Sequence, residues 1–165
     1  NNFRDQCAQA LAEALEVNKT LTQVNLRWNL IETAGAQALV EALKVNQTLT
    51  QIDLSLNNSD AYDAQATEQI KAYIERNKTD AEKLIAAAKS GDANTVKNLL
   101  NQGVSVNYQD QEGNTALHYA AQQGHQTIVE LLVALPQQQL LLNKKGELPK
   151  VSVKATATPV SVKIN

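Results

Sequence analysis

The chain has 165 residues, 43% of them hydrophobic and 19% charged, with a net charge of −2; this balance is typical of a globular protein and excludes an intrinsically disordered one. Neither residues 1–78 nor residues 79–150 carry a net positive charge, so the clustered cations that a nucleic-acid surface needs are missing. No stretch has the roughly 18–20 uncharged apolar residues of a membrane-spanning helix, and the single cysteine, Cys7, excludes an internal disulfide.

The N-terminal half contains an internal repeat. Residues 8–29 read AQALAEALEVNKTLTQVNLRWN, and residues 36–57 read AQALVEALKVNQTLTQIDLSLN, 28 residues later. A unit of this size cannot bury its apolar face alone and has to stack on copies of itself. Because stacked arrays usually present surfaces to other macromolecules, the repeat favours a binding protein over an enzyme.

Each copy predicts a helix followed by a short strand. Residues 36–43 place apolar side chains at positions i, i+3, i+4 and i+7, the spacing of an amphipathic helix, and residues 8–15 do the same. Residues 24–26 read V-N-L and residues 52–54 read I-D-L, which is the alternation of a strand with one buried face. Asn29 and Asn57 follow these strands, and their amides can satisfy backbone groups of adjacent coils that the turn leaves unpaired.

These units, with their LxxVxL and LxxIxL strands followed by asparagine, resemble leucine-rich repeats of the ribonuclease-inhibitor type over about residues 3–78. The resemblance implies a curved solenoid whose strands line a concave binding face. Residues 60–79 fit a third helix with a three-residue insertion that aligns Ile70 with Leu39 and Asn77 with Asn46. No strand follows Thr79, so this helix is expected to end the array.

The pattern changes at Thr79. Residues 79–82 read T-D-A-E, a capping box that predicts a new helix over residues 80–89. Helices over residues 93–101, 114–121 and about 126–132 are expected to follow, with a turn at residues 110–113. Gly91 and Gly124 are 33 residues apart, as are Gly113 and Gly146, which indicates a second class of repeat.

Residues 113–125, which read GNTALHYAAQQGH, resemble the core of an ankyrin repeat, and the resemblance extends over about residues 80–150. It implies helix pairs with projecting fingers, and a binding face on the fingers and inner helices. About two units are present, and the last is degenerate. Pro136 stands where Gly103 stands one unit earlier, so residues 136–142 have to turn differently.

The predicted fold class is therefore an α/β leucine-rich-repeat solenoid, with short parallel strands plus helices, continuing into an all-α ankyrin-repeat stack. The expected domains are residues 1–78, with about two and a half leucine-rich units truncated at the N-terminus, and residues 79–150, with the ankyrin units. Residues 151–165 alternate as V-S-V-K and predict an extended tail or an edge strand.

No glycine- or proline-rich linker separates the two blocks. Each block alone has fewer than the roughly three units that a stable stack needs. We therefore expect the helix of the first block to pack side by side on the first helix of the second block. The residues expected in this seam are Ile70, Tyr73, Ile74, Leu84, Ile85 and Ala88.

Catalytic, metal-binding and cofactor-binding motifs are absent, so we expect no enzyme activity and no cofactor. The ankyrin resemblance assigns His118 to a hydrogen-bonded tie with Thr115, and His125 is interpreted as a turn or cap residue. Cys7 is expected to be a buried small hydrophobe and not a nucleophile.

Trp28 and Arg27 are the sharpest candidates for partner contact, because Trp and Arg are enriched in interface hot spots. Packing of Trp28 against the neighbouring turn is the alternative, since Leu56 occupies the matching place. The full set of candidate protein-binding residues is Gln23, Asn25, Arg27, Trp28, Gln51, Asp53, Ser55, Tyr108, Gln109, Gln111, Glu112, Tyr119, Gln122 and Gln123. Solvated surfaces would explain the polar members of this set without any function.

The sequence thus predicts a monomeric, non-catalytic, cytoplasmic scaffold that binds another protein. The combination resembles interaction regions of large modular proteins, including effectors that bacteria deliver to the host cytosol. Two alternatives stay open. In the first alternative, the chain is a targeting or regulatory segment of an enzyme whose catalytic domain lies outside it. In the second, it is a structural spacer.

Overall fold

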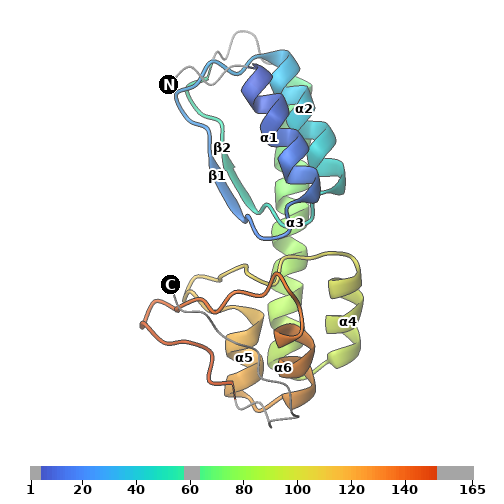
Figure 1. Ribbon diagram of the computed structural model, residues 1–165, viewed down its shortest axis with the longest axis vertical. Coiled ribbons are helices and arrows are strands. Elements are labelled where there is room, and N and C mark those ends of the chain that lie inside the picture. Colours follow the sequence, from blue (N-terminus) through green and yellow to red (C-terminus); the bar gives the residue numbers. More distant parts are fainter. Residues whose placement is uncertain (1–4, 58–63, 152–165) are drawn as a thin grey trace.

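The computed structural model describes residues 5–57 and 64–151, which form two blocks joined by one long helix (Figure 1). The elements are α1 (Asp5–Val17), β1 (Gln23–Asn25), α2 (Thr33–Val45), β2 (Gln51–Asp53), α3 (Ala64–Ser90), α4 (Ala93–Asn101), α5 (Ala116–Gln122) and α6 (Gln126–Val133). We call α1, β1, α2, β2 and the first half of α3 the N-terminal block, and the rest the C-terminal block.

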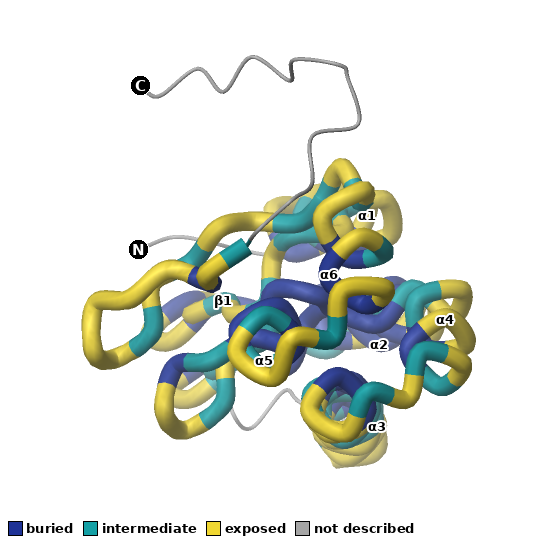
Figure 2. Tube along the Cα trace, turned by 90° about the horizontal axis from the view of Figure 1, so that it is seen from below, coloured by how far each residue is buried: buried dark blue, intermediate teal, exposed yellow. Residues whose placement is uncertain are grey.

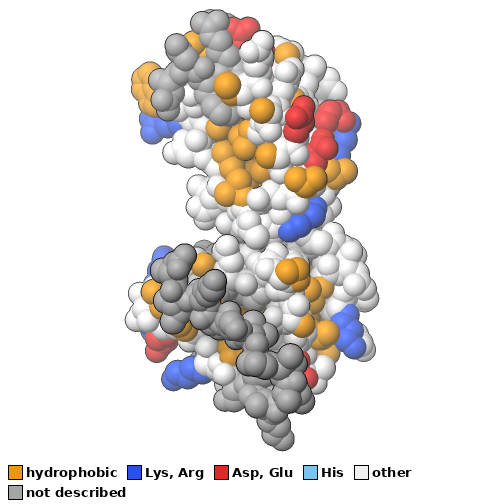
Figure 3. All heavy atoms as spheres, viewed as in Figure 1, with side chains coloured by type: hydrophobic (Ala, Val, Ile, Leu, Met, Phe, Trp, Pro, Cys, Tyr) orange, Lys and Arg blue, Asp and Glu red, His pale blue; other side chains and the backbone are white. Residues whose placement is uncertain are grey.

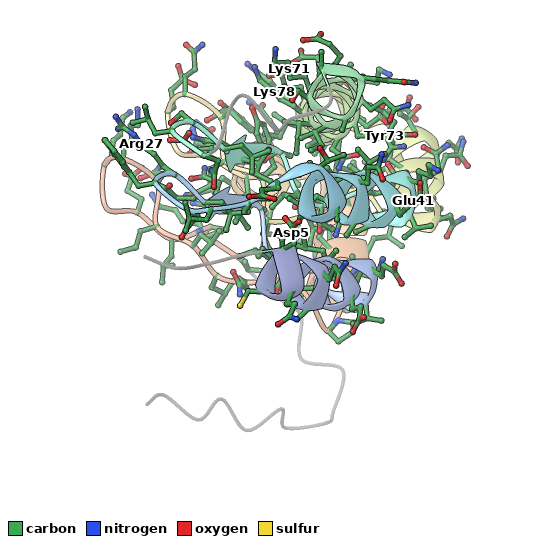
Figure 4. All side chains as sticks on the ribbon, turned by 90° about the horizontal axis from the view of Figure 1, so that it is seen from above. Asp5, Arg27, Glu41, Lys71, Tyr73 and Lys78 are labelled. Atoms are coloured by element: carbon green, nitrogen blue, oxygen red, sulfur yellow. The ribbon has the colours of Figure 1, made fainter. Side chains whose placement is uncertain are left out.

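The N-terminal block has the predicted strand-and-helix solenoid. β1 and β2 pair in parallel, with Val24 opposite Ile52, so the register equals the 28-residue repeat of the sequence. Seen from above in Figure 4, α1, α2 and α3 lie in succession beside the strands. Parallel strands need a crossover connection between them, and α2 supplies it here.

The asparagines that follow the strands bridge adjacent coils, as predicted. The Asn57 side chain donates from Nδ2 to the carbonyl oxygen of Leu26 at 2.8 Å and accepts from the amide of Ile31 at 3.2 Å. Asn29 donates to the same Leu26 carbonyl at 2.9 Å. These bonds satisfy buried backbone groups at the turn, where no strand partner is available.

A second set of asparagines links the ends of the helices. Asn46 donates to the carbonyl oxygen of Leu15 at 2.7 Å, and its Oδ1 accepts from the amide of Leu49 at 2.8 Å. Asn77 lies at the corresponding place in the next unit. It donates to the carbonyl oxygen of Asn46 at 3.0 Å, as Asn46 donates to that of Asn18 at 3.3 Å, and its other acceptor is the carbonyl oxygen of Leu49 at 2.9 Å. The three-residue insertion expected for the third unit is thereby confirmed.

α3 corrects the prediction of a helix break at Thr79. The helix runs without interruption from Ala64 to Ser90, so the T-D-A-E segment caps nothing. A capping box begins a helix only where the preceding helix ends, and α3 contains neither glycine nor proline that would end it. Its buried positions continue through Ala81 and Leu84, which extends the amphipathic helix past Thr79.

The expected side-by-side packing of two helices is wrong for the same reason. Ile70, Tyr73 and Ile74 belong to the hydrophobic cluster of the N-terminal block. Leu84, Ile85 and Ala88 belong to a separate cluster in the C-terminal block. On one straight helix, 14 residues correspond to about 21 Å along the axis, so these side chains lie end to end and share no seam.

The C-terminal block forms the predicted helix pairs. Gly91 and Gly124 end the first helix of each pair with φ of 82° and 72°, a backbone conformation that glycine adopts without strain. Figure 2 shows the buried residues of α3, α5 and α6 converging between the helices. Val151 is partly buried against this cluster, and residues 152–165, with their predicted tail or edge strand, lie outside the described residues.

Candidate interaction surface

The strands of the N-terminal block and the loops of the C-terminal block lie on the same side of α3 (Figures 1 and 2). The strand strip consists of the outward positions Gln23, Asn25, Arg27, Gln51, Asp53 and Ser55. Arg27 and Ser55 each lie two residues beyond the end of their strand. The two fingers are the loops at residues 104–115 and 136–148. The long helix therefore brings two surfaces from different repeat classes to one side.

Two members of the strand strip cap the strand ends. Asn25 Oδ1 accepts from the amide of Arg27 at 2.9 Å, and Asp53 Oδ1 accepts from the amide of Ser55 at 2.9 Å. Hydrogen bonds from the Ser55 side chain and amide lower the pKa of Asp53 from its usual value, with Arg27 adding a smaller effect. Asp53 is therefore a fixed negative charge beside the positive charge of Arg27.

Trp28 projects from the strand exit with 66% of its surface exposed. Its backbone has φ of 58°, and so does that of Leu56, which is 49% exposed at the matching place. A positive φ is unusual for bulky residues; here the hydrogen bond from the Trp28 amide to the carbonyl oxygen of Ser55, at 3.2 Å, holds the turn. The repeated strand exit thus directs a large apolar side chain into solvent.

The fingers contain both structural and exposed candidate residues. The Tyr108 hydroxyl donates to Glu82 at 3.2 Å; burial of the phenol, with the charge of Glu82, raises the pKa of Tyr108 to about 12. The Tyr119 hydroxyl donates to Asp110 at 2.7 Å, and Gln109 Nε2 donates to the carbonyl oxygen of Leu142 at 2.8 Å, tying one finger to the next.

Four other predicted positions of the C-terminal block lie nearer to solvent. Gln111 and Glu112 are exposed on the first finger, and Gln122 and Gln123 are exposed at the end of α5. These side chains can reach a partner directly, whereas Tyr108, Gln109 and Tyr119 also position the fingers.

A cleft of about 420 Å³ lies between the two blocks. Its walls are Thr20, Leu21, Thr22 and Gln23 from the N-terminal block and Asn107, Gln109, Gln139 and Leu141 from the C-terminal block. The outline of the molecule in Figure 3 narrows at this level. Sequence reasoning identified only Gln23 and Gln109 here, because the cleft exists only when one continuous helix sets the two blocks above each other.

Hydrophobic side chains also gather between the strands and α1 on the face seen in Figure 3. Leu11 and Val24 are partly buried and pack against the cluster of the N-terminal block. This face is the first layer of the stack among the described residues, so its side chains have a neighbour on one side only.

Both histidines have the expected structural roles. His118 is buried; its Nδ1 accepts from the Thr115 amide at 3.1 Å and lies 2.9 Å from the Thr115 hydroxyl, while Nε2 donates to the Glu147 carbonyl oxygen at 3.1 Å. His125 is the N-cap residue of α6, and its ring donates from Nε2 to the carbonyl oxygen of Lys89.

Cys7 corrects another prediction, because it is exposed and not buried. The buried face of α1 consists of Ala8, Ala12 and Leu15, at i, i+4 and i+7. Cys7 precedes Ala8 by one residue, which turns its side chain about 100° around the helix and away from the cluster.

No group of three or more His, Cys, Asp or Glu side chains suited to a metal ion occurs within residues 5–57 and 64–151. Across the same residues, no helix combines the length and hydropathy needed to span a membrane.

Two families match the chain. The family of ankyrin repeats, in three copies, matches residues 57–145, and the leucine-rich repeat family matches residues 17–40 and 45–58. The ankyrin match begins ahead of the expected residue 80 and takes in all of α3, which is consistent with one helix serving both blocks. Repeats of these classes are protein-interaction scaffolds, and this is the function class that the matches indicate.

Several relatives share part of this sequence. An ankyrin repeat protein of Rickettsia felis is 38% identical over 63 residues, which are 38% of this chain and 94% of that protein. Serine/threonine-protein kinase 12 of Arabidopsis thaliana is 43% identical over 51 residues, 31% of this chain and 11% of the kinase. The human 2-5A-dependent ribonuclease is 40% identical over 67 residues, 40% of this chain and 9% of the ribonuclease.

The chain therefore spans about a tenth of the length of the kinase and the ribonuclease, but nearly all of the Rickettsia felis protein. The ankyrin match extends over more than half of the chain, and the parallel strands and helix pairs have the geometry of the two repeat classes. This chain belongs to the ankyrin repeat family and carries leucine-rich repeats in its N-terminal block.

Proposed function

We propose that this chain is a non-catalytic scaffold that binds a partner protein on the side formed by the strand strip and the fingers. The observation that carries the proposal is the placement of both surfaces on one side of α3, with a cleft between them (Figure 1). Trp28 and Arg27 are exposed at the strand exit, and they are residue types that contribute most to binding energy at interfaces.

The proposed partner is a protein and not a nucleic acid. The net charge is −2, and the strand strip mixes Arg27 with Asp53, whereas a phosphate-binding surface needs clustered cations. We propose that the scaffold works as a monomer and without a cofactor. We also propose that residues 1–78 and 79–150 act as two repeat domains, because the two hydrophobic clusters separate within α3, between Ile74 and Ala81.

The proposed location is the cytoplasm, or the host cytosol if the parent protein is a secreted effector. The exposed thiol of Cys7, which forms no disulfide, supports a reducing compartment. A free surface cysteine would be prone to form intermolecular disulfides in an oxidising one.

A second candidate function is a targeting or regulatory segment of an enzyme. The Arabidopsis thaliana and human relatives described above are named as enzymes, and the chain matches only about a tenth of each. The domain content of the full parent protein distinguishes this role from that of a dedicated scaffold.

The test is affinity capture from a cytosolic extract, with the captured protein then produced pure and titrated against variants. Arg27→Glu and Trp28→Ala probe the strand strip, and Glu112→Lys probes the first finger. Lys97→Glu is the matched control, because Lys97 is exposed on α4, on the other side of the C-terminal block (Figure 1). We expect the dissociation constant for the captured protein to rise at least about tenfold in each of the first three variants and to stay unchanged in the control.

The composite surface is refuted if the three variants keep wild-type melting curves and bind the captured protein as tightly as wild type does. Loss of binding in Arg27→Glu and Trp28→Ala alone would restrict the surface to the N-terminal block and contradict a site shared by the two repeat classes.

A further inference from the structure

The third unit of the N-terminal block has a helix but no strand among the described residues. Asn77 on α3 donates to the carbonyl oxygen of Asn46, as Asn46 donates to that of Asn18, which places the first half of α3 as the third helix of the stack. After Asn46 the chain turns into β2, whereas after Asn77 the helix continues to Ser90. Within residues 5–57 and 64–151 the sheet therefore ends at β2, where one more strand would stand.

The outer edge of β2 presents backbone groups that no described strand pairs with. The carbonyl oxygens of Asp53 and Ser55 accept from the amides of Leu26 and Trp28 on the β1 side, at 2.8 and 3.2 Å. Because backbone groups of successive residues point to opposite edges of a strand, the amides of residues 52 and 54 point away from β1. They have the direction and spacing that a further parallel strand needs.

A groove lies between this edge and α3. Its volume is about 520 Å³, and its apolar lining comes from Ile52, Leu54, Leu56, Ala64 and Ile70, together with the methyl group of Thr67. Figure 4 shows that Lys71, on the rim of the groove, lies at the end of the helix stack opposite Asp5 on α1. The groove therefore lies on the last layer of the solenoid, which β2 and the first half of α3 form, and no finger residue lines it.

The preceding unit shows what fills such a groove. Leu26, Ala36 and Leu39 are the equivalents of Leu54, Thr67 and Ile70, and they are 6%, 0% and 0% exposed. The next layer of the stack lies beside them, with β2 paired to β1 and α3 packed on α2. Leu54 and Thr67 are only partly buried, because no described strand covers them.

We propose that this groove is a docking site for an extended segment of a partner protein, which adds to β2 as a third parallel strand. The site continues the β1–β2 ladder with the same register and the same apolar layer, so it selects a segment with branched apolar residues at alternate positions, as in the Ile-Asp-Leu of residues 52–54. Strand addition of this kind derives affinity from backbone hydrogen bonds and specificity from alternate side chains. Of the residues that line the groove, only Ser55 also belongs to the strand strip, and none of Arg27, Trp28 and Glu112 lines it, so either proposal can fail without the other.

The test uses a synthetic peptide, TLTQIDLSLN, copied from residues 48–57, titrated into the whole chain and followed by NMR. We expect saturable binding with one peptide per chain and slower hydrogen exchange at the amides of Ile52 and Leu54. A control peptide carrying Ile52→Asp and Leu54→Asp keeps the backbone but removes the apolar side chains. It should bind about tenfold more weakly or not at all, because apolar pockets discriminate at this level.

Variants of the chain locate the site. Thr67→Trp fills the groove and should weaken peptide binding at least about tenfold, whereas Thr127→Trp makes the same change at an exposed position of α6 and should not. If the melting curve shows that Thr67→Trp does not fold, Ala64→Trp at an exposed lining position replaces it.

Four results would overturn the proposal. These are equal binding of the two peptides, unchanged exchange at Ile52 and Leu54, wild-type binding by the folded groove variant, and protection of these amides without peptide. In the last case, protection that depends on protein concentration would assign the edge to a second copy of the chain, and protection lost on deleting residues 152–165 would assign it to that segment.

Discussion

Replacing Asn46 by alanine tests the link between the repeated asparagines and the stability of the solenoid. The side chain is 0% exposed. It donates to the Leu15 carbonyl oxygen at 2.7 Å and accepts from the amides of Thr48 and Leu49 at 3.0 and 2.8 Å. Asn46→Ala leaves these three buried groups without their partner, at about 1 kcal/mol or more each. We therefore expect the free energy of unfolding to fall by about 3 kcal/mol, a large part of the roughly 5–15 kcal/mol typical of a domain.

The assay is urea unfolding followed by circular dichroism, together with amide hydrogen exchange by NMR. Exchange should accelerate most in α1, α2 and β2, which surround the hydrophobic cluster of the N-terminal block. It should accelerate much less in α5 and α6, because these helices belong to a separate cluster and are linked to the first through α3. Asn101→Ala, at the exposed end of α4, is the control and should change stability by no more than about 0.5 kcal/mol.

Two results would refute this reasoning. If Asn46→Ala unfolds at the same urea concentration as Asn101→Ala, the side chain does not supply the backbone partners that the structure shows. If exchange in α5 and α6 accelerates as much as in α2, the two blocks unfold as one cooperative unit, and the separation of their clusters has no energetic meaning.

Two further predictions concern α3 and a tyrosine that packs against it. Thr79→Pro removes a backbone hydrogen bond inside the helix between the two blocks and should destabilise the chain by about 3 kcal/mol. Thr79→Ala keeps the backbone amide and is the control. Equal urea midpoints for the two variants would contradict a continuous helix. Burial and the charge of Glu82 raise the pKa of Tyr108 to about 12, so its contribution to stability is complete below about pH 10, the unfolded value, and is lost as the pH rises towards 12. In an ultraviolet titration, Glu82→Gln should lower this pKa while burial keeps it above the unfolded value; an unchanged pKa would mean that the contact with Glu82 is absent in solution.

Much of the fold could be predicted because it is local or strictly periodic. The 28-residue spacing gives the pairing of Val24 with Ile52 directly, since a repeat that stacks on its copy must place equal positions opposite each other. The tie between Thr115 and His118 is three residues long and follows from the motif alone. The exposure of Trp28 at the strand exit follows from the same repeat geometry, although packing against the next turn was an alternative interpretation of the sequence.

The helix break at Thr79 shows why a local signal can mislead. Thr-Asp-Ala-Glu offers side-chain partners for the first amides of a helix, but those amides already have backbone partners when the preceding turn is helical. Which state prevails depends on what α3 packs against. Its first half is buried by α2, and its second half by α4 and α5, and these contacts outweigh the weak preference of Thr79 and Asp80 for a cap.

Sequence alone therefore determined the two repeat classes, the register of the strands and the hydrogen-bonding roles of the asparagines, because each follows from residues a fixed period apart. Only the tertiary structure decided that one helix serves both blocks, and with it the cleft between Leu21 and Leu141 and the edge of β2 that no described strand covers. These features depend on how far a helix continues and which way its faces turn, and many distant contacts set both.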